Sequence, residues 1–233
     1  WSSKEKTGTV YYLPSGTIRD IETGKAVITG RNPDGSVIAK YTDEGVTPPK
    51  RVWNMKTHNA ETYGTNVLNA MIGKRFNYPK SLYAVQDTLR FFVANKPNAL
   101  IVDFFAGSGT TLHAVNLLNA EDGGHRRCIL VTNNEVSADE AKTLSAQGYQ
   151  PGDPEWEQYG IARYVTWPRT VCSIEGHDVN GKPLKGDYIT SGEEPMHMAD
   201  GFKANAAFFK LGFLDKNAVA LGRQFKELLP VLW

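Results

Sequence analysis

A short apolar run that ends in an aspartate and a glycine turn constrains this chain more than any other stretch. The run from Leu100 to Val102 is typical of a central strand buried on both faces, and Asp103 ends it. Gly107 and Gly109 permit a tight turn and a close approach of the backbone to a ligand, and the two threonines that follow can cap a helix. The sequence therefore predicts a strand, a turn and a helix that surround a small polar ligand, such as a nucleotide, with backbone N–H groups and one carboxylate.

The glycine spacing by itself does not name the ligand. No lysine follows the second glycine, as a P-loop requires, and Leu112 stands where the dinucleotide pattern needs its third glycine. The stretch from Asp103 to Thr111 instead resembles, letter for letter, motif I of S-adenosylmethionine-dependent DNA amino-methyltransferases. The alternative is a chance glycine turn. The resemblance implies S-adenosyl-L-methionine as cofactor, bound by Asp103, Phe104, Phe105, Ala106, Gly107, Ser108, Gly109 and Thr110.

A second pattern lies about two dozen residues before the first. Pro79, Lys80 and Ser81 precede a predicted helix from about Leu82 to Val93 and resemble motif X of the same enzymes. The resemblance implies that Lys80 pairs with a carboxylate at the methionine end of the cofactor. It also implies that Ser81 caps the helix and donates to the same group. The alternative is an ordinary capped helix with a solvated lysine.

A second buried strand is predicted from Cys128 to Thr132, after a helix from Leu112 to Asn119. In strand-helix-strand nucleotide sites an acidic residue beyond the second strand binds the ribose hydroxyls. Glu135 is in that position, somewhat late, and Asn133 shares or takes its role. The alternative for Glu135 is a plain strand-end residue. The amino-acid sequence around these residues is similar to that of the modification subunits of type III restriction-modification systems.

Composition restricts the class of protein. The 233 residues are 41% hydrophobic and 22% charged, without a membrane-length apolar run or a secretory signal, so no membrane contact is expected. The two cysteines, Cys128 and Cys172, are interpreted as reduced thiols of a cytoplasmic protein. The five histidines have no metal-ligand spacing, and no metal is expected.

Charge and aromatic residues suggest a nucleic-acid partner. Residues 1–100 contain 14 Lys and Arg against 8 Asp and Glu, a net charge of +6, whereas the remainder has a net charge of −5. Ordinary scatter of surface charge is the alternative. Arg163 and Arg169, beside Tyr164 and Trp167, are candidates for contacts with double-stranded DNA. Packing around a helix-to-loop corner is the favoured alternative for these residues.

The first 49 residues are predicted to form a small β-rich module, and residues 50–233 the cofactor-binding region. Thr9 to Leu13, Ala26 to Thr29 and Val37 to Tyr41 are β-prone runs, and residues 32–35 form a hairpin turn signal. A linker is expected over residues 42–50. Its Pro48 and Pro49 do not match the catalytic Pro-Pro motif of amino-methyltransferases, because Thr47 and Lys50 supply neither the acceptor nor the aromatic ring.

The resemblance therefore implies a partial, permuted, Rossmann-like α/β methyltransferase fold without its catalytic half. The chain is interpreted as the C-terminal, cofactor-binding fragment of an adenine N6-methyltransferase, with no catalytic residue of its own. The module of residues 1–49 would be the end of a target-recognition region. The missing N-terminal catalytic half and a restriction subunit are the expected protein partners, and removal of that half is expected to cause self-association.

The sequence is also compatible with two other functions. One is a non-catalytic cofactor- or DNA-binding subunit that works beside a separate catalytic chain. The other is an unrelated Rossmann-like enzyme that uses a dinucleotide. Beyond the motifs, the sequence predicts a helix over residues 137–147 with Ala138, Ala141 and Leu144 inward, a third strand over residues 208–214 and a helix over residues 219–229.

Overall fold

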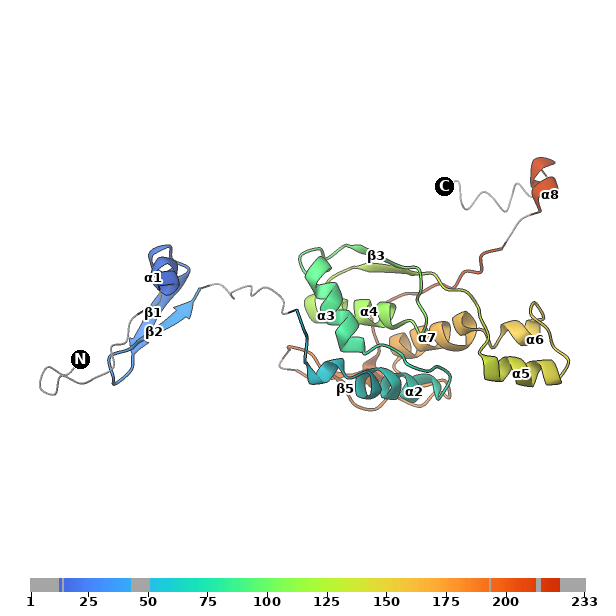
Figure 1. Cartoon of the computed structure of the whole chain (residues 1–233), viewed down its shortest axis with the longest axis horizontal. Helices are drawn as coiled ribbons and strands as arrows, with labels where there is room; N and C mark the ends of the chain where they lie inside the picture. Colours follow the sequence, from blue (N-terminus) through green and yellow to red (C-terminus); the bar gives the residue numbers. More distant parts are fainter. Residues whose placement is uncertain (1–12, 14, 43–50, 193, 213–214, 223–233) are drawn as a thin grey trace, which may run out of the picture. The chain divides into compact units, whose positions relative to one another are not determined.

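A computed structural model describes residues 13, 15–42, 51–192, 194–212 and 215–222 of the chain (Figure 1). The chain divides into two compact units, residues 1–53 and residues 54–233. Among the described residues, every helix is too short or too polar to cross a membrane.

The first unit is a helix followed by a β-hairpin. Its elements are α1 (Ser15–Glu22), β1 (Ala26–Arg31) and β2 (Val37–Tyr41), and the two strands pair antiparallel. The turn between them closes because Gly35 N–H donates to Asn32 O at 2.9 Å and Asn32 N–H donates to Ser36 O at 2.8 Å. These observations confirm the two predicted strands and the turn. The first β-prone run and the linker lie almost wholly outside the described residues, and α1 was not predicted.

The second unit contains the elements of the candidate site, with short helices and short strands around them. In chain order they are η1 (Lys56–His58), η2 (Glu61–Thr65), α2 (Asn66–Ile72), α3 (Leu82–Val93), β3 (Leu100–Asp103), α4 (Thr110–Asp122), β4 (Arg127–Leu130), α5 (Ala138–Ala146), α6 (Pro154–Glu157), η3 (Ala162–Thr166), α7 (Trp167–Glu175), β5 (Asp187–Tyr188), β6 (Met196–His197), η4 (Met198–Asp200) and α8 (Lys216–Ala220).

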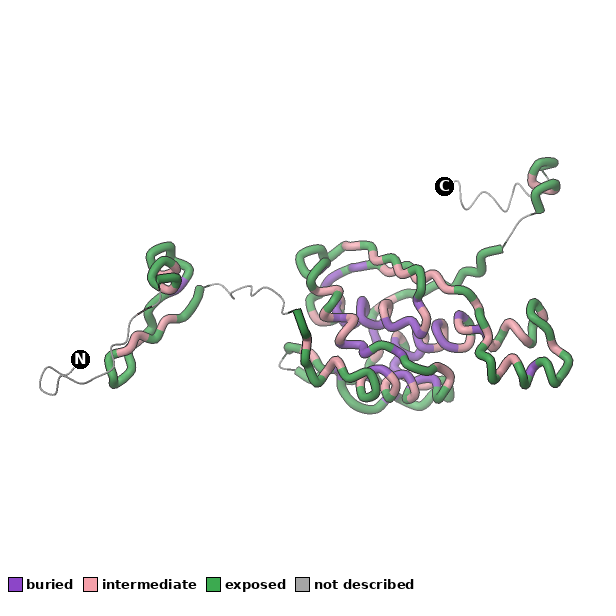
Figure 2. The backbone as a smooth tube through the Cα atoms, in the orientation of Figure 1, coloured by how far each residue is buried: buried purple, intermediate pink, exposed green. Residues whose placement is uncertain are grey.

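The core of this unit lies among α2, α4 and α7, where the buried residues are concentrated (Figure 2). Leu68 of α2, Leu117 of α4 and Cys172 of α7 are buried in one apolar cluster. The segment after α7 completes the cluster with Tyr188 and Phe202. Since α4 directly follows the glycine turn, the core fixes the helix that begins at the candidate site.

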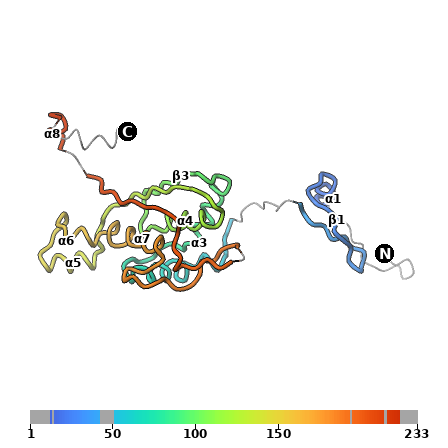
Figure 3. The backbone as a smooth tube through the Cα atoms, turned by 180° about the vertical axis from the view of Figure 1, so that it is seen from behind, coloured from blue at the N-terminus to red at the C-terminus, as the bar shows by residue number. Residues whose placement is uncertain are grey.

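The sheet beside α4 consists of two parallel strands, β3 and β4, in the register Leu100 to Arg127 and Val102 to Ile129. Helices α3 and α4 lie on one side of these strands (Figures 1 and 3). The other side is open, because Leu100, Val102 and Ile129 are between 43% and 50% exposed. The prediction that Leu100 to Val102 is buried on both faces is therefore wrong: among the described residues, β3 pairs only with β4.

The predictions from the sequence agree with the structure better for the helices near the sheet than for the C-terminal segment. The helices predicted at residues 82–93 and 137–147 are confirmed, although Ala138 is exposed rather than turned inward. The predicted strand at 208–214 is wrong for residues 208–212, which are irregular and exposed, because no described strand pairs with them. Helix α8 begins before the predicted residue 219 and ends at Ala220, and residues 223–229 lie outside the described residues.

Gly64 permits a close contact that positions the segment before α3. A Cβ atom at Gly64 would lie 2.7 Å from Pro79 O and 2.9 Å from Lys80 O, both of them backbone atoms that cannot move aside alone. We therefore expect Gly64→Ala to lower the stability of the second unit by about 1–3 kcal/mol, measured by thermal unfolding. Gly16→Ala is the matched control, because a Cβ atom at Gly16, in α1, would have nothing within 4 Å of it. Equal melting temperatures for Gly64→Ala and the unchanged chain would contradict this packing.

Candidate functional site

The loop between β3 and α4 is held at the carboxyl ends of the two parallel strands. Val131 N–H donates to Asp103 O at 2.8 Å, and Ala106 N–H donates to Val131 O at 3.2 Å. The Asp103 carboxylate binds the loop at two points: Oδ1 accepts from Phe105 N–H at 2.9 Å and Oδ2 accepts from Thr111 Oγ1 at 2.6 Å. One carboxylate thus joins the end of β3 to the start of α4.

Both glycines of the turn have a left-handed backbone. The φ angles are +51° at Gly107 and +75° at Gly109, and Gly109 is the residue that caps α4. The prediction that the threonines cap the helix is wrong, because both hydroxyls have other partners. Thr111 donates to Asp103, and Thr110 Oγ1 accepts a hydrogen bond from Arg169 Nη1 at 2.7 Å. Glycine replaces a side-chain cap where the backbone itself must turn.

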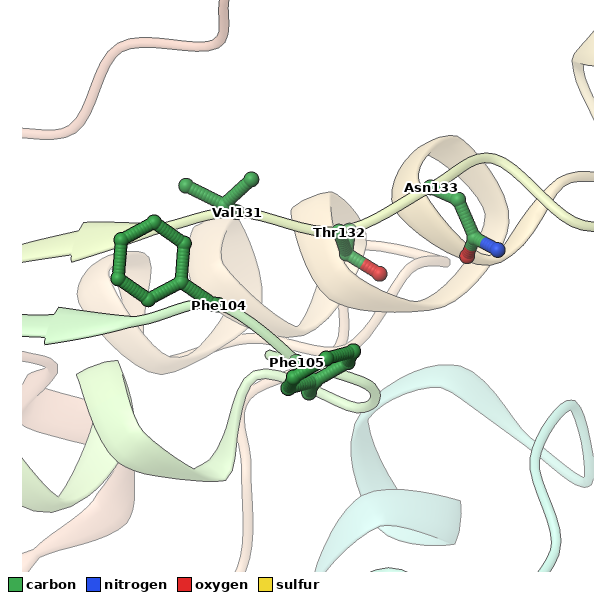
Figure 4. A pocket seen from close by; sticks show the side chains of 5 residues that line it. All are labelled: Phe104, Phe105, Val131, Thr132 and Asn133. Carbon is green, nitrogen blue, oxygen red and sulfur yellow. The ribbon is translucent and has the colours of Figure 1, made fainter.

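A pocket of about 240 Å³ opens beside the loop. Figure 4 shows its lining: Phe104 and Phe105 follow β3, and Val131, Thr132 and Asn133 follow β4. The Phe105 side chain is 92% exposed, which is unusual for a ring of this size and leaves its face available for stacking. The pocket thus combines aromatic and apolar surface with the polar groups of Thr132 and Asn133.

The residues predicted to bind a ribose lie at one end of this pocket. Asn133 lines the pocket, and its Nδ2 donates to Glu135 Oε2 at 3.3 Å. The structure therefore brings Asn133 and Glu135 together. Asn134, between them, has a different role, since its side chain bonds to Glu157 O and to the Glu157 carboxylate.

The segment before α3 approaches the same loop. The Phe76 ring lies 3.8 Å from the position of a Cβ at Gly107, and Lys80, a few residues further on, is exposed. Ser81 caps α3 as predicted, accepting from Ala84 N–H at 3.3 Å. Its hydroxyl donates to Thr57 O at 2.7 Å and the residue is buried, so the further prediction that it donates to a ligand is wrong in this structure.

A comparison with known families identifies the chain. A family model described as DNA methylase matches residues 4–143, which include the Asp103 loop, the pocket and the segment before α3. The chain belongs to the DNA methylase family.

Three curated relatives agree with this family. The chain is 30% identical to the EcoPI Mod subunit, a type III restriction-modification enzyme of Escherichia phage P1, over 64% of this chain and 21% of the relative. It is 34% identical to the StyLTI Mod subunit, of the same type and from Salmonella typhimurium, over 72% of this chain and 26% of the relative. It is 41% identical to the type II methyltransferase M.KpnI of Klebsiella pneumoniae, over 36% of this chain and 20% of the relative.

These matches confirm the resemblance to type III modification subunits. The chain spans only about a fifth to a quarter of the length of the relatives that it matches.

The two arginines that were predicted to contact DNA, Arg163 and Arg169, lie in different environments in this DNA methylase chain. Arg163 is exposed at the surface of η3. Arg169 is 1% exposed, and its guanidinium binds Ser108 and Thr110 from inside the fold. The prediction that Arg169 contacts DNA is therefore wrong, because its donors are directed into the protein. The favoured alternative, packing at a corner, describes it better.

Three residues that contact the DNA methylase loop or lie behind it were not predicted. Thr166 Oγ1 donates to Gly107 O at 2.6 Å, and the buried pair His113 and Tyr188 lies behind Arg169. These contacts join residues 59 and 75 positions apart in the chain, so no local sequence pattern predicts them. Among the described residues, no three His, Cys, Asp or Glu side chains are grouped so that they could hold a metal ion.

Proposed function

We propose that this chain is the S-adenosylmethionine-binding part of a site-specific DNA methyltransferase of a restriction-modification system, acting on adenine N6. The observation that carries the proposal is the Asp103–Thr111 loop, which joins a parallel strand to a core helix beside an aromatic pocket. Such a loop at the carboxyl edge of a parallel sheet is where α/β proteins bind nucleotide-like ligands. The fold on this proposal is a partial, permuted, Rossmann-like methyltransferase fold.

The residues present fit this cofactor. Among the described residues, the amide N–H groups of Gly107 and Ser108 have no acceptor; Gly107 is partly exposed and can offer its N–H to a polar ligand, whereas Ser108 is buried. Phe105 offers a ring face for an adenine. Asn133 and Glu135 offer acceptors for ribose hydroxyls, and Lys80 offers a cation for a carboxylate. When bound, S-adenosylmethionine supplies an electrophilic methyl group on its sulfonium.

The contribution of this chain to the reaction is binding and alignment. Asp103 fixes the loop through Phe105 and Thr111, so the pocket has its shape before a ligand arrives. Gly107 and Gly109 let the backbone N–H groups face the ligand. On this proposal Phe104, Ala106, Ser108 and Thr110 contribute backbone and packing to the same loop. A preorganised loop of this kind lowers the entropy cost of aligning a donor with its acceptor.

On this proposal, residues outside this chain bind the target amine that accepts the methyl group. The only Pro-Pro pair in the 233 residues, Pro48–Pro49, lacks the neighbours that would hold a target amine. We propose that an N-terminal catalytic half supplies the catalytic motif, that residues 1–49 end the target-recognition region, and that residues 50–233 bind the cofactor. Adenine rather than cytosine N4 as target rests on the resemblance to type III modification subunits.

The proposed partners follow from the same assignment. Double-stranded DNA is the substrate, with the target base turned out of the helix, and Arg163 is a surface candidate for a phosphate contact. The relatives named Mod subunits belong to type III restriction-modification enzymes, and on that basis a restriction subunit is a proposed partner. A cytoplasmic location is proposed together with this function.

A thermal-shift comparison of two adenine-containing ligands tests the proposed cofactor. S-adenosylhomocysteine at about 100 times its Kd should stabilise the 233-residue chain by about 2.7 kcal/mol, which appears as a higher melting temperature. NAD at the same concentration is the control and should leave the melting temperature unchanged. Stabilisation by NAD and not by S-adenosylhomocysteine would replace this proposal with a dinucleotide enzyme.

A further inference from the structure

Arg169 occupies an unusual position for a cation, inside the protein and directly behind the candidate cofactor loop. It lies on α7 and is 1% exposed. Its Nη1 donates to Thr110 Oγ1 at 2.7 Å, to Ser108 Oγ at 3.1 Å and to Ser108 O at 3.3 Å. One guanidinium nitrogen therefore holds the end of the glycine loop and the first residue of α4 together.

The hydrogen-bond acceptors of Arg169 are neutral groups. Among the described residues, Arg169 forms no ion pair with a carboxylate, and its Nε is buried without any hydrogen-bond acceptor. The other buried arginine of this unit behaves differently, since Arg126 Nη2 lies 2.8 Å from Asp122 Oδ2. A buried charge without a counter-charge is costly, and folds usually pair it. The loop thus has a positive charge behind it that the described part of the chain leaves uncompensated.

The imidazole on the far side of Arg169 does not supply the missing negative charge. His113 Nδ1 faces Arg169 Nη2 at 3.4 Å and His113 Nε2 lies 2.8 Å from Tyr188 Oη. Burial, together with the charge of Arg169, holds the pKa of His113 well below its usual range, so the ring is neutral. Burial also lowers the pKa of Arg169 to about 10, which leaves the guanidinium protonated at neutral pH. Arg169 is therefore a cation among neutral groups.

We propose that Arg169 is a positioning residue for the anionic end of the bound cofactor: it fixes Ser108 and Thr110 from inside, and its unpaired charge favours a carboxylate at the loop. This inference rests on the proposed function and deepens it. The charge acts through the protein interior, where screening by water and salt is weak. It adds to the N–H group of the partly exposed Gly107, which has no acceptor, and to the positive end of α4, and both favour an anion at the same place.

Two substitutions separate the charge of Arg169 from its packing. Arg169→Lys keeps the positive charge, whereas Arg169→Gln removes the charge and keeps a neutral amide on a shorter side chain. The affinities of two ligands are measured for the 233-residue chain and both variants by calorimetry. S-adenosylhomocysteine carries the carboxylate, and 5′-methylthioadenosine has the same adenosine and thioether but no carboxylate. The measured quantity is the ratio of the two Kd values within each protein.

We expect Arg169→Gln to reduce the preference for S-adenosylhomocysteine by about tenfold, because only the ligand with a carboxylate loses an interaction. Arg169→Lys should keep the preference within about threefold of the original. Because 5′-methylthioadenosine is measured on the same sample, its binding shows that the variant is folded. Equal weakening of both ligands by Arg169→Gln, or the same loss of preference in Arg169→Lys, would overturn the inference and leave Arg169 a purely structural residue.

A measurement on the unchanged chain covers the case in which neither variant folds. The methyl ester of S-adenosylhomocysteine lacks the negative charge of the free acid and should bind about tenfold more weakly. Equal affinities for acid and ester would overturn the inference, whereas the proposed cofactor would still stand. If the unchanged chain binds neither S-adenosylhomocysteine nor 5′-methylthioadenosine, the proposed function itself fails and the inference falls with it.

Discussion

Asp103→Ala is expected to abolish measurable binding of S-adenosylhomocysteine to the 233-residue chain. The two carboxylate oxygens accept hydrogen bonds from Phe105 N–H and from Thr111 Oγ1, so the substitution releases both ends of the loop. A hydrogen bond to a charged group contributes about 1.5–3 kcal/mol, and loss of two such bonds corresponds to a loss of affinity of about a hundredfold or more. Isothermal titration calorimetry measures the affinity directly.

Two further variants show which part of Asp103 matters. Asp103→Asn keeps one acceptor oxygen but loses the charge, and an intermediate loss of affinity is expected. Thr111→Val removes only the bond to Oδ2, and about a tenfold loss is expected. Far-ultraviolet circular dichroism of each variant excludes general unfolding. An affinity of Asp103→Ala within a factor of about two of the original would refute the role of this carboxylate.

Local signals in the sequence were sufficient to predict several of the helices, strands and turns. Ser81 before an amphipathic stretch predicts a capped helix, and α3 begins at the following residue. The Asn-Pro-Asp-Gly turn predicts the hairpin of the first unit, because each of these residues favours a turn through its own backbone or side chain. The motif from Asp103 to Thr111 predicts a strand, a left-handed glycine turn and a helix, and all three are present.

Long-range packing decided the features that the sequence did not predict. Whether Arg169 faces the solvent or the core depends on how α7 lies against α4, and no local pattern encodes that contact. The same applies to Ser81, whose hydroxyl is occupied by a carbonyl 24 positions earlier in the chain, Thr57 O. The apolar run of β3 correctly predicted a strand. Its burial, however, depends on neighbouring elements, which the described residues supply on one side only.

The open side of β3 and β4 is expected to make the isolated chain self-associate. Leu100, Val102 and Ile129 are each between 43% and 50% exposed there, and Phe104 next to them is 67% exposed. Among the described residues the outer edge of β3 has no strand beside it, so backbone groups are also available for pairing. An apolar surface next to an unpaired strand edge promotes association. On the proposed function, the catalytic half of the longer protein covers this surface.

Sedimentation velocity over a range of concentrations tests this expectation. The unchanged chain should form dimers or larger species at micromolar concentration. The double variant Val102→Thr, Ile129→Thr should shift toward the monomer, because threonine keeps the β propensity but reduces the apolar surface. Val27→Thr with Ile28→Thr is the matched control, because these two exposed apolar residues lie in β1 of the first unit.

If the unchanged chain sediments as a monomer with a cooperative melt, the open face of β3 and β4 does not drive association. An equal shift in the control would assign the association to exposed apolar surface in general.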